Sequence, residues 1–451
     1  MTIQISPTEV GSGSGAAIRS AYLTNLLNLR QDLDPAASWL QTIRDRATAT
    51  VQELAIPSTR EEDWRFTDLA GLLKVNFQAV DQSPALSFAE IQPFLLPEAI
   101  NSRLVFVNGV YDPALSCVDD LPDGVVVCNL MTIAALMDGP EAEMVDTLPG
   151  YLAGFKGSEE VFTALNTASM IDSAIVWIPN EQEVETPIQI LYVATATQTT
   201  IAHPRCLVVV ESDSQLTLIE DFVSLHEGVY LTNSVTEILV DNNAQVNHTR
   251  VQRDSTDAFH IGKTVVSQAR DSRYTCNAIG LGAKLSRHNL EVHQNGEQTE
   301  TTLNGLTMLA GEQLGDTHSS IAFTRPHATS SQLHKCIVDD RARAVFNGKI
   351  LVPKPAQLTN AAQLSRTLLL SPKARVDTKP QLEITADNVK CAHGATVSQL
   401  EDDEVFYLQS RGINQDEARK LLVYAFAHEV INRVPVESLR QMLSREVAVE
   451  T

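Results

Sequence analysis

The sequence has few aromatic residues, no closely paired cysteines and no excess of positive charge. Aromatic residues make up 5% of the chain, which is low for a surface that binds sugars or stacks on bases. The formal net charge of -22 argues against a nucleic acid or an anionic membrane as the main partner. None of the six cysteines belongs to a Cys-x-x-Cys pair, which disfavours a zinc ribbon, a thioredoxin-like site and a self-contained ferredoxin site.

Long apolar segments are also missing. The chain has no run of about 18 apolar residues, and its first residues lack the basic and apolar pattern of a signal peptide. We therefore expect no transmembrane helix, no membrane partner, and a cytoplasmic protein with free thiols. The Ser/Gly cluster at 11–15 lacks the Lys-Ser/Thr of a phosphate-binding loop, so residues 1–15 are predicted to be a flexible leader.

The chain contains no Gly-x-Ser-x-Gly elbow, no His-Glu-x-x-His motif and no ATP-binding loop. A β-helical enzyme acting on polysaccharides is the alternative from the enzyme classes, and it requires carboxylates clustered in an outer groove. The carboxylate run Glu401–Glu404 lies where strands give way to helix, so a solvated linker is the simpler interpretation. We predict a non-catalytic protein that takes any energy input from a partner.

The apolar pattern divides the rest of the chain into three parts. Residues 16–102 are predicted to form an N-terminal helical region, in which Ser58 and Glu61 have capping-box spacing. From 103 to 400, short apolar stretches separated by turn residues predict a β core, with one short helical interruption near 160–170. Residues 401–451 are predicted to form a C-terminal helical region.

The β core has a regular turn spacing. Small or polar turn residues recur at intervals of about 14 to 15 residues, for example around Ala328, Ala342 and Ala356. No helical pattern separates the strands between 203 and 397, which argues against a doubly wound α/β fold. A fixed interval favours a mainly β fold, a β-solenoid whose coils bury their faces against one another. A stacked β-sandwich is the alternative, although its hairpins would need more Asn-Gly turns than the chain contains.

The C-terminal region predicts an amphipathic helix. Asn414 and Glu417 have the spacing of an N-terminal cap. The apolar residues that follow share one face of the helix and include Leu421, Leu422, Ala425 and Phe426. This face either covers the solenoid or docks a partner, and the sequence leaves both possibilities open.

Cys391 and His393 are the candidate ligands of the chain. Alternate side chains of a strand share a face, so both can point at the same object, and both suit borderline or soft metals. Two ligands make only half of a tetrahedral site, so the others must come from elsewhere. Val389 and Val397 share their face, so the pair could equally belong to a core. A similar pair, His334 and Cys336, weakens the argument from spacing, and most histidines of the second half are expected on outer faces or at turns.

Several longer motifs surround this pair. In the C-terminal half they are VFNGKI at 345–350, RTLLLS at 366–371, KPQLEI at 379–384, VKCAHGATV at 389–397 and FYLQSRGI at 406–413. Weaker ones upstream are EEDWRFT at 61–67, FTALN at 162–166 and HPR at 203–205. Together they resemble the SufB/SufD family of the SUF iron–sulfur cluster assembly system, and the Cys-x-His-Gly-Ala-Thr run resembles its SufD side.

The resemblance implies a right-handed parallel β-helix between two helical regions. It also implies a scaffold complex with SufB and the ATPase SufC, in which SufC docks on the C-terminal helices that carry Leu421 and Phe426. A transient iron–sulfur cluster would then form near the SufB–SufD interface, with His393 as a ligand and Cys391 as the second candidate. Two alternatives remain beside this prediction: a purely structural subunit that positions SufB and SufC, and a homodimer of this chain in isolation.

Overall fold

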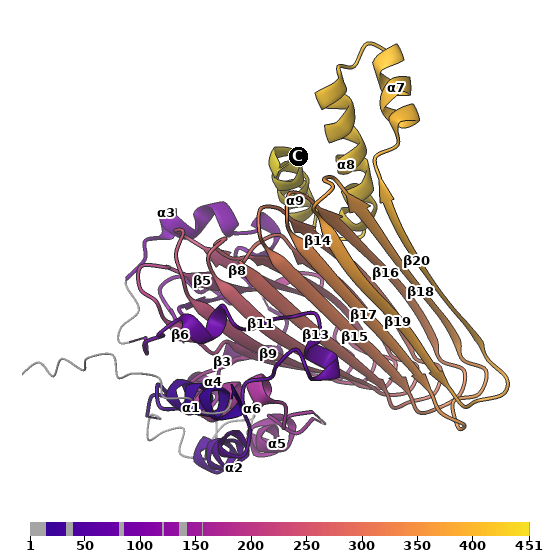
Figure 1. Ribbon diagram of the computed structural model, residues 1–451. Helices are drawn as coiled ribbons and strands as arrows, with labels where there is room; N and C mark the ends of the chain where they lie inside the picture. Colours follow the sequence, from indigo (N-terminus) through magenta and orange to yellow (C-terminus); the bar gives the residue numbers. More distant parts are fainter. Residues whose placement is uncertain are drawn as a thin grey trace, which may run out of the picture.

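The computed structural model describes residues 15–32, 39–80, 85–119, 121–134, 142–155 and 157–450. It shows a parallel β-solenoid with helices near both ends of the chain, which confirms the predicted fold class (Figure 1). The predicted leader lies outside the described residues except for Gly15, with which helix α1 begins.

The strands are β1 Arg103–Val107, β2 Val110–Tyr111, β3 Val126–Asn129, β4 Ala174–Ile178, β5 Ile188–Ala194, β6 Ile201–Ala202, β7 Arg205–Val210, β8 Gln215–Ser224, β9 Leu231–Val240, β10 Gln245–Arg253, β11 Phe259–Gln268, β12 Arg273–Gly280, β13 Leu285–Gln294, β14 Glu300–Leu309, β15 Leu314–Phe323, β16 Thr329–Val338, β17 Arg343–Val352, β18 Asn360–Leu369, β19 Arg375–Ile384 and β20 Lys390–Gln399. The α-helices are α1 Gly15–Leu27, α2 Leu40–Gln52, α3 Phe88–Ile91, α4 Leu130–Ala134, α5 Ala142–Tyr151, α6 Val161–Ser169, α7 Asp402–Ser410, α8 Gln415–Ile431 and α9 Glu437–Glu450. Short 3-10 turns are η2 Glu62–Trp64, η3 Leu72–Lys74, η4 Gln92–Phe94 and η5 Pro97–Ala99. The sequence predicted the interruption at α6, whereas α4 and α5 were not expected.

Two sheets form the walls of the solenoid. From β9 onward, successive strands alternate between the sheets, and each pairs in parallel with the strand two places before it, whereas β8 pairs with β5. One sheet ends at β20 and the other at β19. Among the described strands, antiparallel pairing is confined to β1 with β2 and β3 with β4, so the hairpins of a stacked sandwich are not formed and that alternative is wrong.

Inner and outer faces follow the strand alternation. In β18 the buried Ala361 and Gln363 alternate with the exposed Ala362 and Leu364. Because neighbouring strands are in register, the inner side chains stack into columns that run along the lumen. The apolar part of the lumen forms one continuous cluster, from Leu104 to beyond Val352.

The turns repeat as closely as the strands. Residues in the left-handed region recur at one corner of successive coils, at Asp271, Gln298, His327 and Leu358. Their amides bond to the next coil, as from His327 N to Gln357 O over 3.0 Å. The alanines that marked the turn spacing, Ala328, Ala342 and Ala356, are all fully buried.

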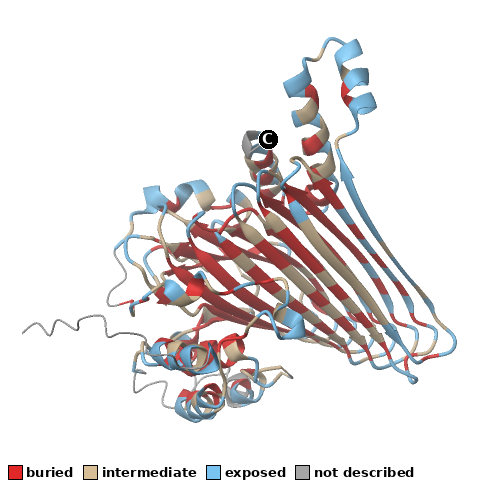
Figure 2. Ribbon diagram, viewed as in Figure 1, coloured by how far each residue is buried: buried red, intermediate tan, exposed pale blue. Residues whose placement is uncertain are grey.

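The helices cover opposite outer walls (Figures 1 and 2). Helices α1, α2 and α6 pack through Leu26, Val51 and Leu165 on the sheet of β9 and β11. Helices α8 and α9 pack through Val430 and Leu443 on the sheet of β14 and β16. Within the described ranges, no helix combines the length and apolar character needed to span a bilayer.

Candidate functional site

The Cys391–His393 pair lies on β20, the last strand of its sheet. β20 pairs with β18, and its other edge faces away from the solenoid. Figure 2 shows the strands nearest this end largely in pale blue, because no further coil covers them. The neighbouring strand β19 ends the other sheet in the same way. The two edges together form the open end of the solenoid.

The register decides which face the pair occupies. Cys391 lies beside Ala361 and His393 beside Gln363, and both of these β18 residues are buried in the lumen. Parallel strands in register keep equivalent side chains on one face. Cys391 and His393 therefore continue the inner face, yet His393 is exposed because β20 has no coil stacked beyond it.

The two side chains differ in environment. Cys391 is half-buried and packs against the apolar luminal cluster, and this burial raises the pKa of its thiol. The thiol is therefore neutral near pH 7 until a metal or a base takes its proton. His393 stands about 6.6 Å further along the strand. The pair thus offers an imidazole that is free to bind and a thiol that binding would deprotonate.

The chain does not complete a metal site around this pair. Across the described ranges, nowhere do three or more His, Cys, Asp or Glu side chains gather in a geometry that could hold a metal ion. Within the described residues, Cys391 and His393 therefore stand at the open end without a third such side chain beside them, and their role as ligands stays a prediction.

The second His/Cys pair serves the core. Cys336 is fully buried, and His334 stacks on Phe346 with ring centroids 4.6 Å apart. Gly305 makes room for this imidazole, because a Cβ there would stand 2.0 Å from His334 Nδ1. His334 and Cys336 therefore pack inside the solenoid.

The prediction that most of these histidines face outward is wrong for a group of them. The imidazoles buried in the lumen are His248, His260, His288 and His334. Polar partners hold two of them: His248 Nε2 lies 3.0 Å from Glu220 Oε2, and His260 Nδ1 lies 2.8 Å from Asp254 Oδ2. Burial of a polar group is tolerated when it is hydrogen-bonded, and a single sequence does not reveal such partners in advance.

We expect the protein to lose stability in mild acid because of His334. Burial lowers the pKa of His334 to about 4, below the unfolded value of about 6.5. The unfolded chain then binds more protons between these pH values, so this contribution is complete above pH 6.5 and is lost as the pH falls. Denaturant unfolding should show a loss of about 2 kcal/mol between pH 7.5 and pH 5 from this residue. His334→Gln should flatten this part of the pH dependence, and an unchanged slope would contradict the assignment.

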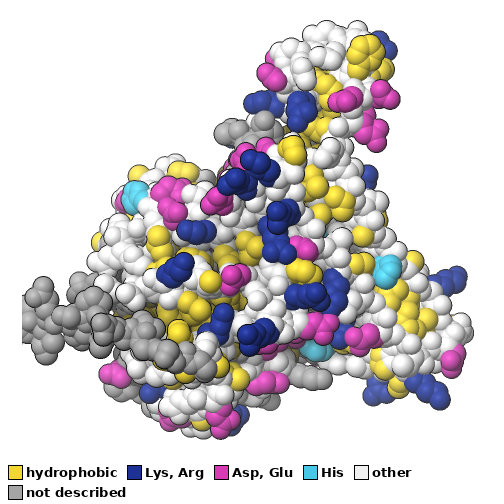
Figure 3. Space-filling view, in the orientation of Figure 1, with side chains coloured by type: hydrophobic (Ala, Val, Ile, Leu, Met, Phe, Trp, Pro, Cys, Tyr) yellow, Lys and Arg dark blue, Asp and Glu magenta, His cyan; other side chains and the backbone are white. Residues whose placement is uncertain are grey.

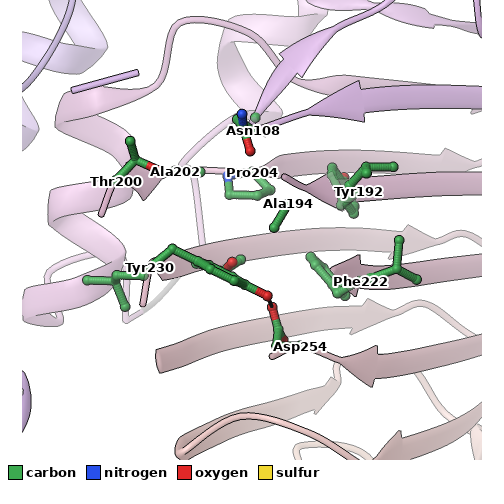
Figure 4. A pocket seen from close by; sticks show the side chains of 14 residues that line it. Asn108, Tyr192, Ala194, Thr200, Ala202, Pro204, Phe222, Tyr230 and Asp254 are labelled. Atoms are coloured by element: carbon green, nitrogen blue, oxygen red, sulfur yellow. Dashed lines mark hydrogen bonds between the residues drawn. The ribbon is translucent and has the colours of Figure 1, made fainter. Parts of the chain in front are cut away.

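A pocket at the other end of the solenoid is an alternative location for the functional site (Figure 4). It lies between β5, β8 and the segment before β9, seven strand steps from β20, or roughly 34 Å. Its acidic residue is already paired: Asp254 Oδ1 accepts from Tyr230 Oη over 2.9 Å, and Asp254 Oδ2 accepts from Gln252 Nε2 over 2.7 Å. These polar groups stabilise the wall of the solenoid, so the open end is the better candidate for the functional site.

The C-terminal helices place the predicted docking residues in two different environments. Phe426 packs on β16, where Lys335 Nζ lies 4.2 Å from the ring centroid and donates to Phe426 O over 2.9 Å. Leu422 is half-buried, whereas Leu421 and Ala425 are exposed. The predicted helical face is therefore partly bound within the chain and partly free.

Two exposed aromatic residues were not predicted from the sequence to form a docking surface. Phe406 and Tyr407 on α7 are 69% and 58% exposed, and Leu421 on α8 is 45% exposed. Figures 1 and 3 show α7 and the start of α8 projecting from the solenoid, with apolar side chains among charged ones. Two adjacent aromatics after the acidic run Glu401–Glu404 were the available signal. We call Phe406, Tyr407 and Leu421 the projecting apolar group.

The upstream motifs have structural roles. In EEDWRFT, Thr67 Oγ1 donates to Asp316 Oδ2 over 2.5 Å, and Arg287 lies 4.0 Å above the Trp64 ring. In FTALN and HPR, Asn166 and Arg205 join α6 to the solenoid wall. These contacts dock the N-terminal region on the sheet that ends at β19.

Comparison with known proteins identifies the family. Residues 18–190 match the model of the SufBD protein N-terminal region, and residues 192–426 match "SUF system FeS cluster assembly, SufBD core domain". The chain is 48% identical to the iron-sulfur cluster assembly SufBD family protein slr0076 of Synechocystis, over 90% of both chains. It is 34% identical to the chloroplastic protein ABCI7 of Arabidopsis thaliana, over 98% of this chain and 93% of that protein.

The SufD side of the family is also represented. The chain is 32% identical to the iron-sulfur cluster assembly protein SufD of Escherichia coli, over 86% of this chain and 88% of that protein. The two family models cover nearly all described residues, from the helices that dock on the wall to the open end. This chain therefore belongs to the SufB/SufD family of the SUF iron–sulfur cluster assembly system, as a SufD-like member.

Proposed function

We propose that this chain is a scaffold subunit that pairs with SufB, docks the ATPase SufC and shares the ligands of a nascent iron–sulfur cluster with SufB. Its family has a role in iron–sulfur cluster assembly. The observation that carries the finer proposal is the position of His393: on the inner face of the last strand, exposed at the open end, with Cys391 on the same face. We place the complex in the cytoplasm, where thiols stay reduced.

The open end favours pairing with a second solenoid. The free edges of β19 and β20 present unpaired backbone donors and acceptors, and such edges are stabilised by strand addition. Exposed apolar side chains near the edges, Val397, Ile384 and Leu364, add surface to bury. A SufB subunit seated there would bring its own ligands to Cys391 and His393. In isolation, a second copy of this chain could occupy the same edge.

A cluster held between two chains suits a scaffold. Replacing thiolate by neutral imidazole lowers the negative charge around an iron–sulfur cluster and changes its potential and lability. Neither chain alone would then complete the coordination. The cluster could form in the complex and leave when the interface changes, with ATP hydrolysis by SufC as the energy source.

Anaerobic reconstitution of the three-subunit complex tests the ligand role. We expect His393→Ala to lower the cluster content at least about tenfold, while complex formation persists. His226→Ala is the matched control, because His226 is exposed on the loop between β8 and β9, far from the open end. Equal cluster content in the His393→Ala and unmutated complexes would overturn the ligand role and favour the purely structural subunit.

A further inference from the structure

A directional chain of hydrogen bonds crosses the lumen just beneath His393. Gln332 Nε2 on β16 donates to Ser319 Oγ on β15 over 2.7 Å. Gln363 Nε2 on β18 donates to Gln332 Oε1 over 2.8 Å. All three side chains are buried. Each amide nitrogen therefore donates toward the interior of the solenoid. The next acceptor in the chain is the amide oxygen of Gln363, which lies one coil closer to the open end than Gln332.

The fold makes room for this chain at Gly348. Gly348 lies on the inner face of β17, and a Cβ there would stand 1.8 Å from Gln363 Nε2. The Gln363 amide therefore rests against the backbone of the opposite sheet, and its Nε2 is directed at Gln332. The side chain is held in one position by packing.

The acceptor end of the chain is open. Gln363 is 3% exposed, and its Oε1 is buried without a hydrogen-bond partner among the described residues. Leaving such a buried acceptor unpaired is unfavourable. Nε2 is directed at Gln332 on β16, and the oxygen and nitrogen of a planar amide diverge, so Oε1 is directed elsewhere. The inner-face residue next in register is His393.

We propose that Gln363 Oε1 accepts a hydrogen bond from one ring N–H of His393. The neighbouring side chains are about 4.8 Å apart at the backbone, and rotation of the exposed imidazole brings its ring within reach. This bond fixes the neutral tautomer, so that the other ring nitrogen directs its lone pair away from the lumen and toward a metal. Gln363 is then a positioning residue for the ligand His393. The inference rests on the proposed function.

A neutral amide is a suitable hydrogen-bond partner for a histidine that must later release its metal. Metal-bound histidines commonly donate their second N–H to a carboxylate or a carbonyl, and a carboxylate makes the imidazole a stronger ligand. An amide oxygen also orients the ring, but it raises the basicity of the imidazole less than a carboxylate does. The same hydrogen bond would extend the polarised chain from Ser319, which strengthens each bond in it.

Nitrogen NMR of the full chain without metal tests the contact directly. With 15N-labelled histidine at pH 8.5, we expect His393 to show one dominant tautomer, its signals assigned by their loss in His393→Ala. Gln363→Met removes the acceptor and should yield a tautomer mixture. Gln363→Glu should restore the single tautomer, because Gln332 and Ser319 can reverse their donor and acceptor roles. Gln332→Met is the matched control: it removes a buried amide of the same chain but leaves the Gln363 acceptor.

Cluster loading in the three-subunit complex separates this inference from the proposed function. We expect Gln363→Met to lower the cluster content about tenfold and Gln363→Glu to restore it. If His393→Ala lost the cluster while Gln363→Met kept both the cluster and the single tautomer, the inference would fail and the proposed function would stand. If His393→Ala kept the cluster, the proposed function would fail. A tautomer mixture in the unmutated chain, or equal effects of Gln332→Met and Gln363→Met, would reduce Gln363 to a packing role.

Discussion

Replacing Arg205 with methionine is expected to lower the free energy of unfolding by about 3–5 kcal/mol. Arg205 is fully buried, and its Nε donates to Glu237 Oε2 over 3.1 Å. Its Nη1 donates to Asn166 Oδ1 over 3.0 Å and to Thr167 Oγ1 over 2.8 Å. Methionine would leave a buried carboxylate and two acceptors of α6 without this partner.

Denaturant unfolding followed by circular dichroism measures this loss. Limited proteolysis should also cut sooner near α6, because Arg205 joins that helix to the solenoid wall. Arg273→Met is the matched control, since Arg273 is half exposed and lies 3.9 Å from the exposed Glu300, and it should cost less than about 0.5 kcal/mol. Adding Glu237→Leu to Arg205→Met should recover part of the stability, because the uncompensated charge is removed. If Arg205→Met lowered the free energy of unfolding by less than about 1 kcal/mol, the contact between α6 and the solenoid wall would be dispensable.

Charge at the projecting apolar group is expected to weaken the binding of SufC, the ATPase that we propose as a partner. Phe406→Asp or Leu421→Asp should weaken binding of SufC by about 2–4 kcal/mol, or roughly 30-fold to 1000-fold. Both side chains are exposed on helices that project from the solenoid (Figure 1), so the fold should be unaffected. Titration calorimetry with purified SufC measures the affinity.

Two further variants sharpen this test. Leu358→Asp is the matched control, because Leu358 is 47% exposed but lies at a solenoid corner in the left-handed region, which Asp tolerates. Phe426→Asp should instead lower thermal stability, since Phe426 packs against Lys335. Undiminished SufC binding by Phe406→Asp and Leu421→Asp would show that docking uses another surface.

The features predicted correctly from the sequence are those with a local pattern. Short apolar stretches, turns at a fixed interval and the absence of intervening helices predicted the solenoid, because each coil repeats the same short-range contacts. The Asn414 cap was also correct: its side chain accepts from Glu417 N over 2.9 Å. The expectation for His248 and its neighbours failed, because a buried imidazole depends on partners such as Glu220 that stand on other coils.

What the sequence determined by itself is that Cys391 and His393 share one face of a strand in a SufD-like run. Which face of the solenoid they occupy, and whether that face is exposed, depended on tertiary structure. Alternation places two residues together, but stacking of β20 on β18 makes that face the luminal one, and the end of the solenoid leaves it uncovered. The same holds for Gln363, whose open acceptor lies beside His393 only because strands distant in sequence are in register. Local periodicity carries no information on which coil is last or which side chains meet across the lumen.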